Sequence, residues 1–187
     1  MTLSALGIFS AAGAGGVFSS DYELIQTQIV SGSSTTAVTF DVSSFASTYK
    51  HLQVRFTARD TYNYAGGLVL RGTFNSSGSG YAWHQLNGTG STITAASGIN
   101  QSYLRAGIYA GGGFTSGHFA GGVIDILDFA STSKNKHLTS LCGSDGVTVY
   151  WMSGLWQNTN AITSFTLTCD VTAFTAGTRF SIYGSKG

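Results

Sequence analysis

Apolar and polar residues alternate along many short segments of this chain, which is the period of β-strands and not of helices. The clearest case is the segment 52–59. Its apolar members are Leu52, Val54, Phe56 and Ala58. Because side chains two residues apart lie on the same face of a strand, one face of this segment is predicted to enter a core and the other to meet solvent.

About ten such strands are predicted after residue 20, separated by turns rich in Gly, Ser and Asn. The predicted strands cover 22–30, 36–40, 52–59, 68–75, 81–86, 103–109, 119–129, 137–142, two strands within 147–169, and 178–183. We expect one helical turn in 41–49 and irregular structure in the polar segment 87–101. Strands that follow one another without helices predict an all-β fold, an antiparallel two-sheet sandwich that resembles a jelly roll.

Hairpins are predicted at two places. A polar loop at 31–34 joins the first two strands. The second hairpin lies in 147–169, which holds Trp151 and Trp156 and in which Gly154 allows a bend. Val149 and Trp151 share one face of its first strand, and this hairpin is predicted to supply aromatic side chains to the core. Trp156 is expected to be a core anchor.

The composition indicates a surface with few charges. Charged residues make up 9% of the 187 residues, whereas roughly 25% is usual. The surface must therefore be built from Ser, Thr, Asn, Gln and Gly, which suits a protein that is packed in an assembly. The net charge is +1 and the nine Lys and Arg residues are scattered, so a nucleic-acid partner is not expected.

The first twenty residues contain no charged side chain. Their apolar members Leu3, Leu6, Ile8 and Phe9 precede a run of small residues at 10–16. A secretory signal or a docking arm would fit this pattern. The missing positive charges before the apolar part favour the arm, and the Gly and Ser content argues against membrane insertion. We therefore expect an extended N-terminal docking arm at 1–20 and a β-sandwich domain at 21–187.

Motifs of catalysis, cofactor binding and metal binding are missing from the sequence. It contains no nucleophile elbow, zinc-protease motif or phosphate loop, and its four histidines lack metal-ligand spacing. Asp125 and Asp128 are three apart on a predicted strand, so they project to opposite faces and cannot act as a pair. We expect no enzyme, no catalytic residue, no cofactor and no metal.

The two cysteines and the loop aromatics leave alternatives open. Cys142 and Cys169 can form a disulfide only if their strands are neighbours, and buried free thiols are the default. Tyr62 and Tyr64 lie near a predicted loop and are candidate contacts for a glycan or a protein partner. Trp83 could belong to the core or to a ligand platform, and its strand pattern favours the core.

Five segments carry a resemblance to a known family. They are YKHLQVR (49–55), LRGTFN (70–75), IDILDFA (124–130), GLWQNTNAITS (154–164) and FTAGTRFSIYG (174–184). In order and spacing they are similar to small virion structural proteins of tailed bacteriophages, and the likeness covers about residues 20–187. These motifs are structural, so the resemblance implies that the chain belongs to the particle, but it implies neither a location on it nor any catalytic residues.

The resemblance and the composition together predict a virion structural protein. We expect a capsid decoration or cement protein, or a small surface appendage. It would bind neighbouring capsid or tail subunits through its arm and its sheet edges, as a homo-oligomer and by family precedent a trimer. The alternative is a tail-fibre or receptor-binding module that contacts host surface glycans through Tyr62 and Tyr64. An enzyme acting on host polysaccharide is the weakest of the three, because no carboxylate pair can be named.

Overall fold

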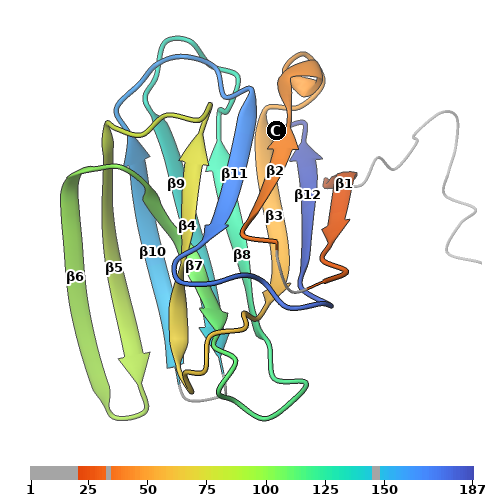
Figure 1. The fold of residues 1–187 in the computed structure, drawn as a ribbon. Coiled ribbons are helices and arrows are strands. Elements are labelled where there is room, and N and C mark those ends of the chain that lie inside the picture. Colours follow the sequence, from red (N-terminus) through yellow and green to blue (C-terminus); the bar gives the residue numbers. More distant parts are fainter. Residues whose placement is uncertain (1–20, 33–34, 145–147) are drawn as a thin grey trace, which may run out of the picture.

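The computed structural model describes residues 21–32, 35–144 and 148–187 and shows an all-β protein of two antiparallel sheets (Figure 1). The predicted β-sandwich class is therefore confirmed. The predicted arm at 1–20, with Leu3, Leu6, Ile8 and Phe9, lies outside the described residues.

The two sheets differ in width. The larger has eight strands, in the order β1 (Glu23–Ile29), β12 (Arg179–Ser185), β3 (His51–Ala58), β8 (Ala120–Leu127), β9 (Lys136–Ser144), β10 (Thr148–Trp156), β5 (Tyr81–Thr89) and β6 (Thr92–Gln101). The smaller has four strands, in the order β2 (Ala37–Asp41), β11 (Ser164–Cys169), β4 (Gly67–Phe74) and β7 (Leu104–Ala110). A 3-10 turn, η2 (Ser43–Phe45), follows β2.

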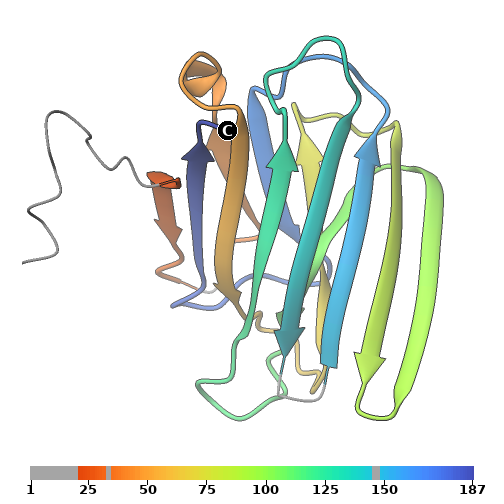
Figure 2. The same ribbon diagram turned by 180° about the vertical axis from the view of Figure 1, so that it is seen from behind.

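Two hairpins account for the extra width of the large sheet. β5 with β6, and β9 with β10, are each consecutive in the chain and pair with each other. Without them, the remaining strands form two equal layers, β1-β12-β3-β8 and β2-β11-β4-β7. Both hairpins join the large sheet beyond β8, so they widen it on one side (Figures 1 and 2).

The core lies between the sheets and contains an aromatic cluster at one end. Phe74 is central to it, with ring centroids 5.8 Å from Trp156, 6.4 Å from Tyr81 and 5.2 Å from Phe165. The Tyr81 hydroxyl accepts a hydrogen bond from the Phe74 amide at 2.8 Å and lies 3.2 Å from the carbonyl of the same residue. Trp156 is 2% exposed, so its predicted burial is confirmed.

The strand 52–59 behaves as its pattern predicts, since Leu52, Val54, Phe56 and Ala58 are all buried. Arg55 and Thr57 on the opposite face are exposed. This strand is β3, which lies between β12 and β8 in the large sheet.

Both predicted hairpins are wrong in their pairing. β1 pairs with β12 and β2 with β11, and the strands on either side of 157–163 lie in different sheets. Alternation shows which residues share a face of a strand but does not show which strand is the neighbour, so the sheet crossing is invisible in the pattern.

Gly154 makes no bend, because β10 keeps an unbroken register with β9 and β5 through it. A Cβ at this position would lie 2.7 Å from Cδ2 of Leu104. The glycine is therefore needed for the close approach of β7 to the inner face of β10.

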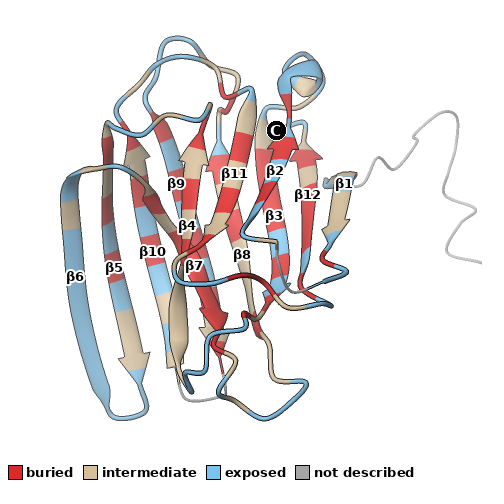
Figure 3. Cartoon of the chain, viewed as in Figure 1, coloured by how far each residue is buried: buried red, intermediate tan, exposed pale blue. Residues whose placement is uncertain are grey.

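The segment 87–101 is also not irregular as predicted. It contains the end of β5, a two-residue turn at Gly90 and Ser91, and the whole of β6. Gly90 has a φ of 65°, which suits a tight hairpin turn. Both faces of β6 are exposed (Figure 3), and its outer face carries only Ile93 and Ala95 as apolar groups in the regular stretch, too few to mark it as a strand.

The two cysteines are free and buried. Cys142 lies on β9 of the large sheet and Cys169 on β11 of the small one. The default of buried free thiols therefore holds.

We expect Trp156→Ala to lower the free energy of unfolding by about 3–5 kcal/mol, because it removes a fully packed ring from the core. Trp151→Ala on the same strand is the matched control. Trp151 is 63% exposed, and its loss should cost about 1 kcal/mol or less. Urea unfolding followed by circular dichroism measures both. Equal losses in the two variants would contradict this packing.

Both thiols should be inert in the native protein. Burial raises the pKa of Cys142 to about 12 and that of Cys169 to about 12, so at pH 8 neither forms the reactive thiolate to a useful extent. We expect no reaction with Ellman's reagent before unfolding and two thiols per chain in guanidinium. A native thiol that reacts at the rate of a free thiol would overturn this prediction.

Candidate functional site

Exposed apolar side chains gather on the outer face of the large sheet, the side turned away from the small sheet. We name this group the outer patch; its members are Leu86, Ile93, Leu141, Val149 and Trp151. They are between 44% and 74% exposed. The patch spans β9, β10, β5 and β6, which form the two hairpins seen beyond β8 in Figure 2.

The strand register places these side chains side by side. Trp151 pairs with Leu141 on one side and with Leu86 on the other. Val123 continues this row beyond Leu141, and Ala95 continues it beyond Leu86. The result is an apolar row across five neighbouring strands.

A second row runs beside the first. Val149 pairs with Gly88 and Gly143, and Ile93 pairs with Gly88 from the far side. The small glycines on either side of Val149 leave its side chain 52% exposed. Neither row contains a charged residue.

Strand β10 explains why this surface exists. Its inward residues Met152 and Trp156 are buried in the core, while its outward residues Val149 and Trp151 are large, apolar and exposed. A strand with large apolar groups on both faces is usual where both faces are covered. In the described part of the chain only the inner face has a cover, so the outer face is a candidate contact surface.

A polar row borders the outer patch. His84, Ser153 and Thr139 are exposed and adjacent in register. With Trp151 and Leu86 they line a shallow hollow of about 400 Å³. The hollow gives a partner side chain a place to insert against the indole ring.

The loop that carries Tyr62 and Tyr64 is a second candidate. Both rings are exposed, by 43% and 49%, and their centroids are 6.4 Å apart. The sequence-predicted contact residues are therefore brought together. Backbone amides of Gly112 and Gly113 donate to the carbonyls of Tyr62 at 2.6 Å and Tyr64 at 3.2 Å, which fixes the loop.

Arg59 anchors the second loop, 111–118, which forms a loop pair with the loop that carries Tyr62 and Tyr64. Its guanidinium donates to the carbonyls of Gly112 at 2.8 Å, Phe114 at 2.7 Å and Thr115 at 2.7 Å. A planar group with several donors fits a set of converging carbonyls. The segment 111–118 is therefore tied to Arg59, the residue after β3, and its Gly112 and Gly113 amides hold the loop of the two tyrosines.

Asp60 completes the support. Its carboxylate accepts hydrogen bonds from the Tyr62 amide at 3.0 Å and from the Thr172 hydroxyl at 3.1 Å. Burial raises the pKa of Asp60 above its ordinary value, and the hydrogen bonds from Tyr62 and Thr172 oppose that rise. The role of this carboxylate is structural, because its accepting oxygens are used by the loop itself.

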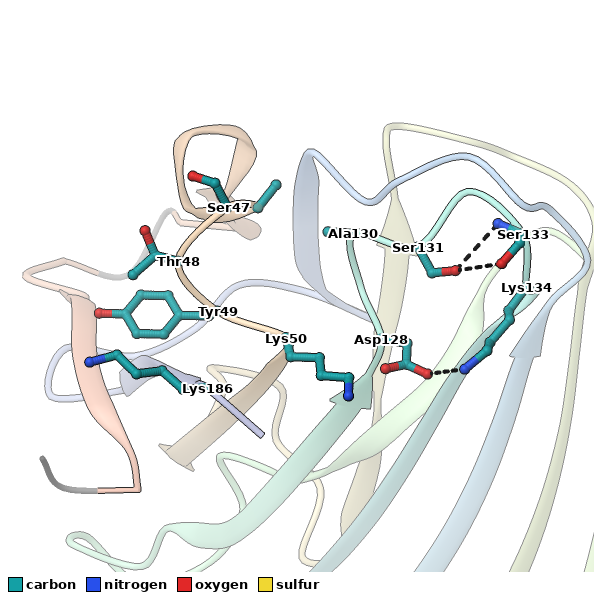
Figure 4. Close-up of a pocket in the computed structure, with 11 residues that line it drawn as sticks. Ser47, Thr48, Tyr49, Lys50, Asp128, Ala130, Ser131, Ser133, Lys134 and Lys186 are labelled. Carbon is teal, nitrogen blue, oxygen red and sulfur yellow. Dashed lines mark hydrogen bonds and ion pairs between the residues drawn. The ribbon is translucent and has the colours of Figure 1, made fainter.

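A cleft of about 470 Å³ opens at the end of the sandwich near η2 (Figure 4). Three lysines line it, Lys50, Lys134 and Lys186. Lys134 is paired with Asp128 at 2.6 Å, and Lys186 with Glu23 at 2.6 Å. With two amines already neutralised, the cleft is a weak candidate for binding an anion.

Asp128 belongs to that ion-pair network. The hydrogen bond from Lys134 is the main cause that lowers the pKa of Asp128. Asp125, the other half of the excluded carboxylate pair, instead accepts a hydrogen bond from Gln53 at 2.8 Å. Both carboxylates have structural partners.

Two further properties hold for the described residues alone. No three His, Cys, Asp or Glu side chains among them are grouped so that they could hold a metal ion. No helix among them is long and apolar enough to cross a membrane.

Trp83, which could have been a ligand platform, is 9% exposed, and the Arg105 guanidinium lies over its ring, 4.1 Å from the ring centroid.

Comparisons of the chain with protein-family models, with curated proteins and with solved structures gave no significant match.

The outer patch was missed by sequence reasoning. The alternation in 147–152 predicts a strand, which the structure extends to Trp156, but the face with Val149 and Trp151 was expected to supply the core. The available signal was the presence of bulky apolar residues on both faces of one strand, which indicates a second contact surface.

Gly111→Ala should destabilise the loop pair, because a Cβ at Gly111 would collide with the Tyr64 backbone carbonyl. Such overpacking typically costs about 1–3 kcal/mol. Gly78→Ala is the control, since a Cβ there meets nothing within 4 Å. Thermal unfolding of both variants is the measurement. A Gly111→Ala protein as stable as the control would show that the loop pair yields easily and does not hold Tyr62 and Tyr64 in place.

Proposed function

We propose that this chain is a structural subunit of a tailed-phage virion, a decoration or cement protein or a small appendage on the capsid or tail surface. It binds neighbouring virion subunits through the outer patch. The observation that carries the proposal is the uncharged apolar surface formed by Leu86, Leu141, Val149 and Trp151. The resemblance of five segments to small virion proteins supports the setting.

The energetics of the outer patch favour a lasting contact. Full burial of a large apolar side chain contributes about 1.5–3 kcal/mol, so the four residues of this surface supply several kcal/mol before the costs of association. Trp151 has the exposure and the adjoining hollow of an interface anchor. A surface of this kind is unfavourable for an isolated protein and useful for one that lives in an assembly.

The strand order supports the same interpretation. We interpret the layers β1-β12-β3-β8 and β2-β11-β4-β7 as a jelly roll to which two hairpins have been added. The outer patch lies on those hairpins, so the additions provide the contact surface and the basic sandwich provides the support.

No catalysis, nucleic-acid partner or membrane insertion is part of the proposal. The segment 1–20 is proposed as a second attachment device.

The test is the occupancy of the chain on purified particles, measured by quantitative mass spectrometry. We expect the wild-type chain at a fixed ratio to the major particle protein. Trp151→Glu should lower that ratio at least about tenfold, because a charge cannot be buried unpaired at a protein contact.

Val171→Glu is the matched control for this experiment. Val171 is apolar and 47% exposed but lies outside the outer patch, so its occupancy should be unchanged. Absence of the wild-type chain from particles would refute the proposed setting. Full occupancy of a folded Trp151→Glu chain would refute the outer patch as the contact.

A second candidate function has one observation in its favour. Tyr62 and Tyr64 form an exposed aromatic pair on a loop that Arg59 and Asp60 hold rigid, and rigid aromatic groups bind at low entropic cost. This arrangement suits a receptor-binding module for host surface glycans. Loss of a glycan-array or host-adsorption signal in Tyr62→Ala or Tyr64→Ala, with the signal retained in Trp151→Glu, would support it.

A further inference from the structure

Strand β6 forms one edge of the large sheet. It pairs with β5 on one side, and among the described residues no strand pairs with its other side. Eight of its ten residues are exposed, because the small sheet ends at β7, which packs over β9 and β10. The strand therefore presents a row of backbone donors and acceptors to its surroundings (Figures 1 and 3).

The other sheet edges within the described residues are protected. β1 is interrupted by a bulge between Leu24 and Gln26, and Glu23 at its start is paired with Lys186. β2 has five residues and ends at Asp41. β7 is buried at six of its seven positions. Bulges, charges, short length and cover are the usual devices that stop sheet edges from pairing with other chains.

β6 lacks most of these devices. Its sequence TITAASGINQ contains no charged residue and no proline. The register shift in its pairing with β5 lies near its C-terminal end, where Asn100 has a φ of 54°. The stretch from Thr92 to Gly98 is left regular, uncharged and open on its outer edge.

We propose that this edge is an interface between two copies of the chain, in which the stretch Thr92–Gly98 of β6 pairs antiparallel with the same stretch of the second copy. This inference deepens the assembly role proposed above by naming one partner. An antiparallel strand pair has two-fold symmetry, so one surface serves both copies.

Ala95 would lie at the two-fold axis, since it is the midpoint of the regular stretch. Ile93 of each copy would then lie opposite Ser97 of the other, and Thr94 opposite Ala96. No like charges meet and no large side chains collide in this register. Because this strand is uncharged and complementary to itself, a second copy of the chain is the partner that fits its edge.

The outer patch continues into this interface. Ala95 pairs with Leu86, which pairs with Trp151, so joining two β6 strands would make one apolar surface from both patches. A dimer that presents two patches can bind an array of subunits with greater avidity than a monomer.

We expect the free dimer to be weak. Pairing of two seven-residue stretches buries less than the roughly 1,200 Å² of a standard interface. The dissociation constant should therefore be in the micromolar range, between about 1 and 100 μM.

The test is sedimentation velocity of the purified full-length chain over a range of micromolar concentrations, with two variants. Ala95→Lys places two like charges together at the two-fold axis and should weaken the dimer at least tenfold. Ser153→Lys adds the same charge to the same face, on β10, and should dimerise like the wild type. Both positions are exposed, so the fold should tolerate them.

Hydrogen exchange of the wild-type chain provides a second readout that needs no variant. Amides in 92–98 should become protected as concentration rises, while those of β1 should not change.

Concentration-dependent dimers that Ala95→Lys disrupts and Ser153→Lys does not would support the inference. A monomer at all concentrations, a trimer, or a dimer that Ala95→Lys does not weaken would each overturn the inference. The trimer is the state expected from family precedent, and it would contradict a two-fold interface because a trimer is built from head-to-tail contacts. Association that is lost on deletion of 1–20, with no change in 92–98 exchange, would assign the contact to the arm and also overturn it. A monomer that still occupies particles would remove this interface and leave the proposed function standing.

Discussion

The unequal width of the two sheets governs this structure. Eight strands face four, so the inner face of the large sheet is covered at β9 and β10 and left open at β6. A β-sheet is stable when its apolar face is packed and its edges are paired or protected. The two hairpins that widen the sheet meet the first condition on their inner side through Met152 and Trp156. They leave an apolar outer face and an unprotected edge.

The features that lack a partner within the described chain thus lie together on the hairpins β9–β10 and β5–β6. Val149 and Trp151 are exposed on the strand whose opposite face anchors the core, and β6 continues the same surface to the edge. A charge content of 9% gives the protein little means to keep such a surface dispersed. An assembly in which neighbours cover the surface resolves this conflict, and it is the setting that the segment resemblance suggests.

The sequence predicted the layers of this fold better than their connections. The period of two identified β3, because it depends on residues close in the chain. The burial of Trp156 was predicted correctly but from a bend at Gly154 that β10 does not make. The pairing of β1 with β12 and the separation of β10 from β11 depend on contacts between distant segments, which alternation does not encode. β6 was missed because Ile93 and Ala95 alternate with polar residues too briefly to mark a strand that is exposed on both faces. Of the candidate contacts, Tyr62 and Tyr64 were found by their place near a loop, whereas the outer patch became visible only once the sheet order was known.

The central claim is that the outer face of the large sheet is buried against a neighbouring subunit in the assembled particle. Electron cryomicroscopy of purified particles, at a resolution that shows the two layers of the sandwich, tests it most directly. We expect density for this chain at the particle surface, with the face that carries Leu141 and Trp151 against an adjacent subunit. A particle in which that face points into solvent, while a different face makes the contacts, would contradict the claim.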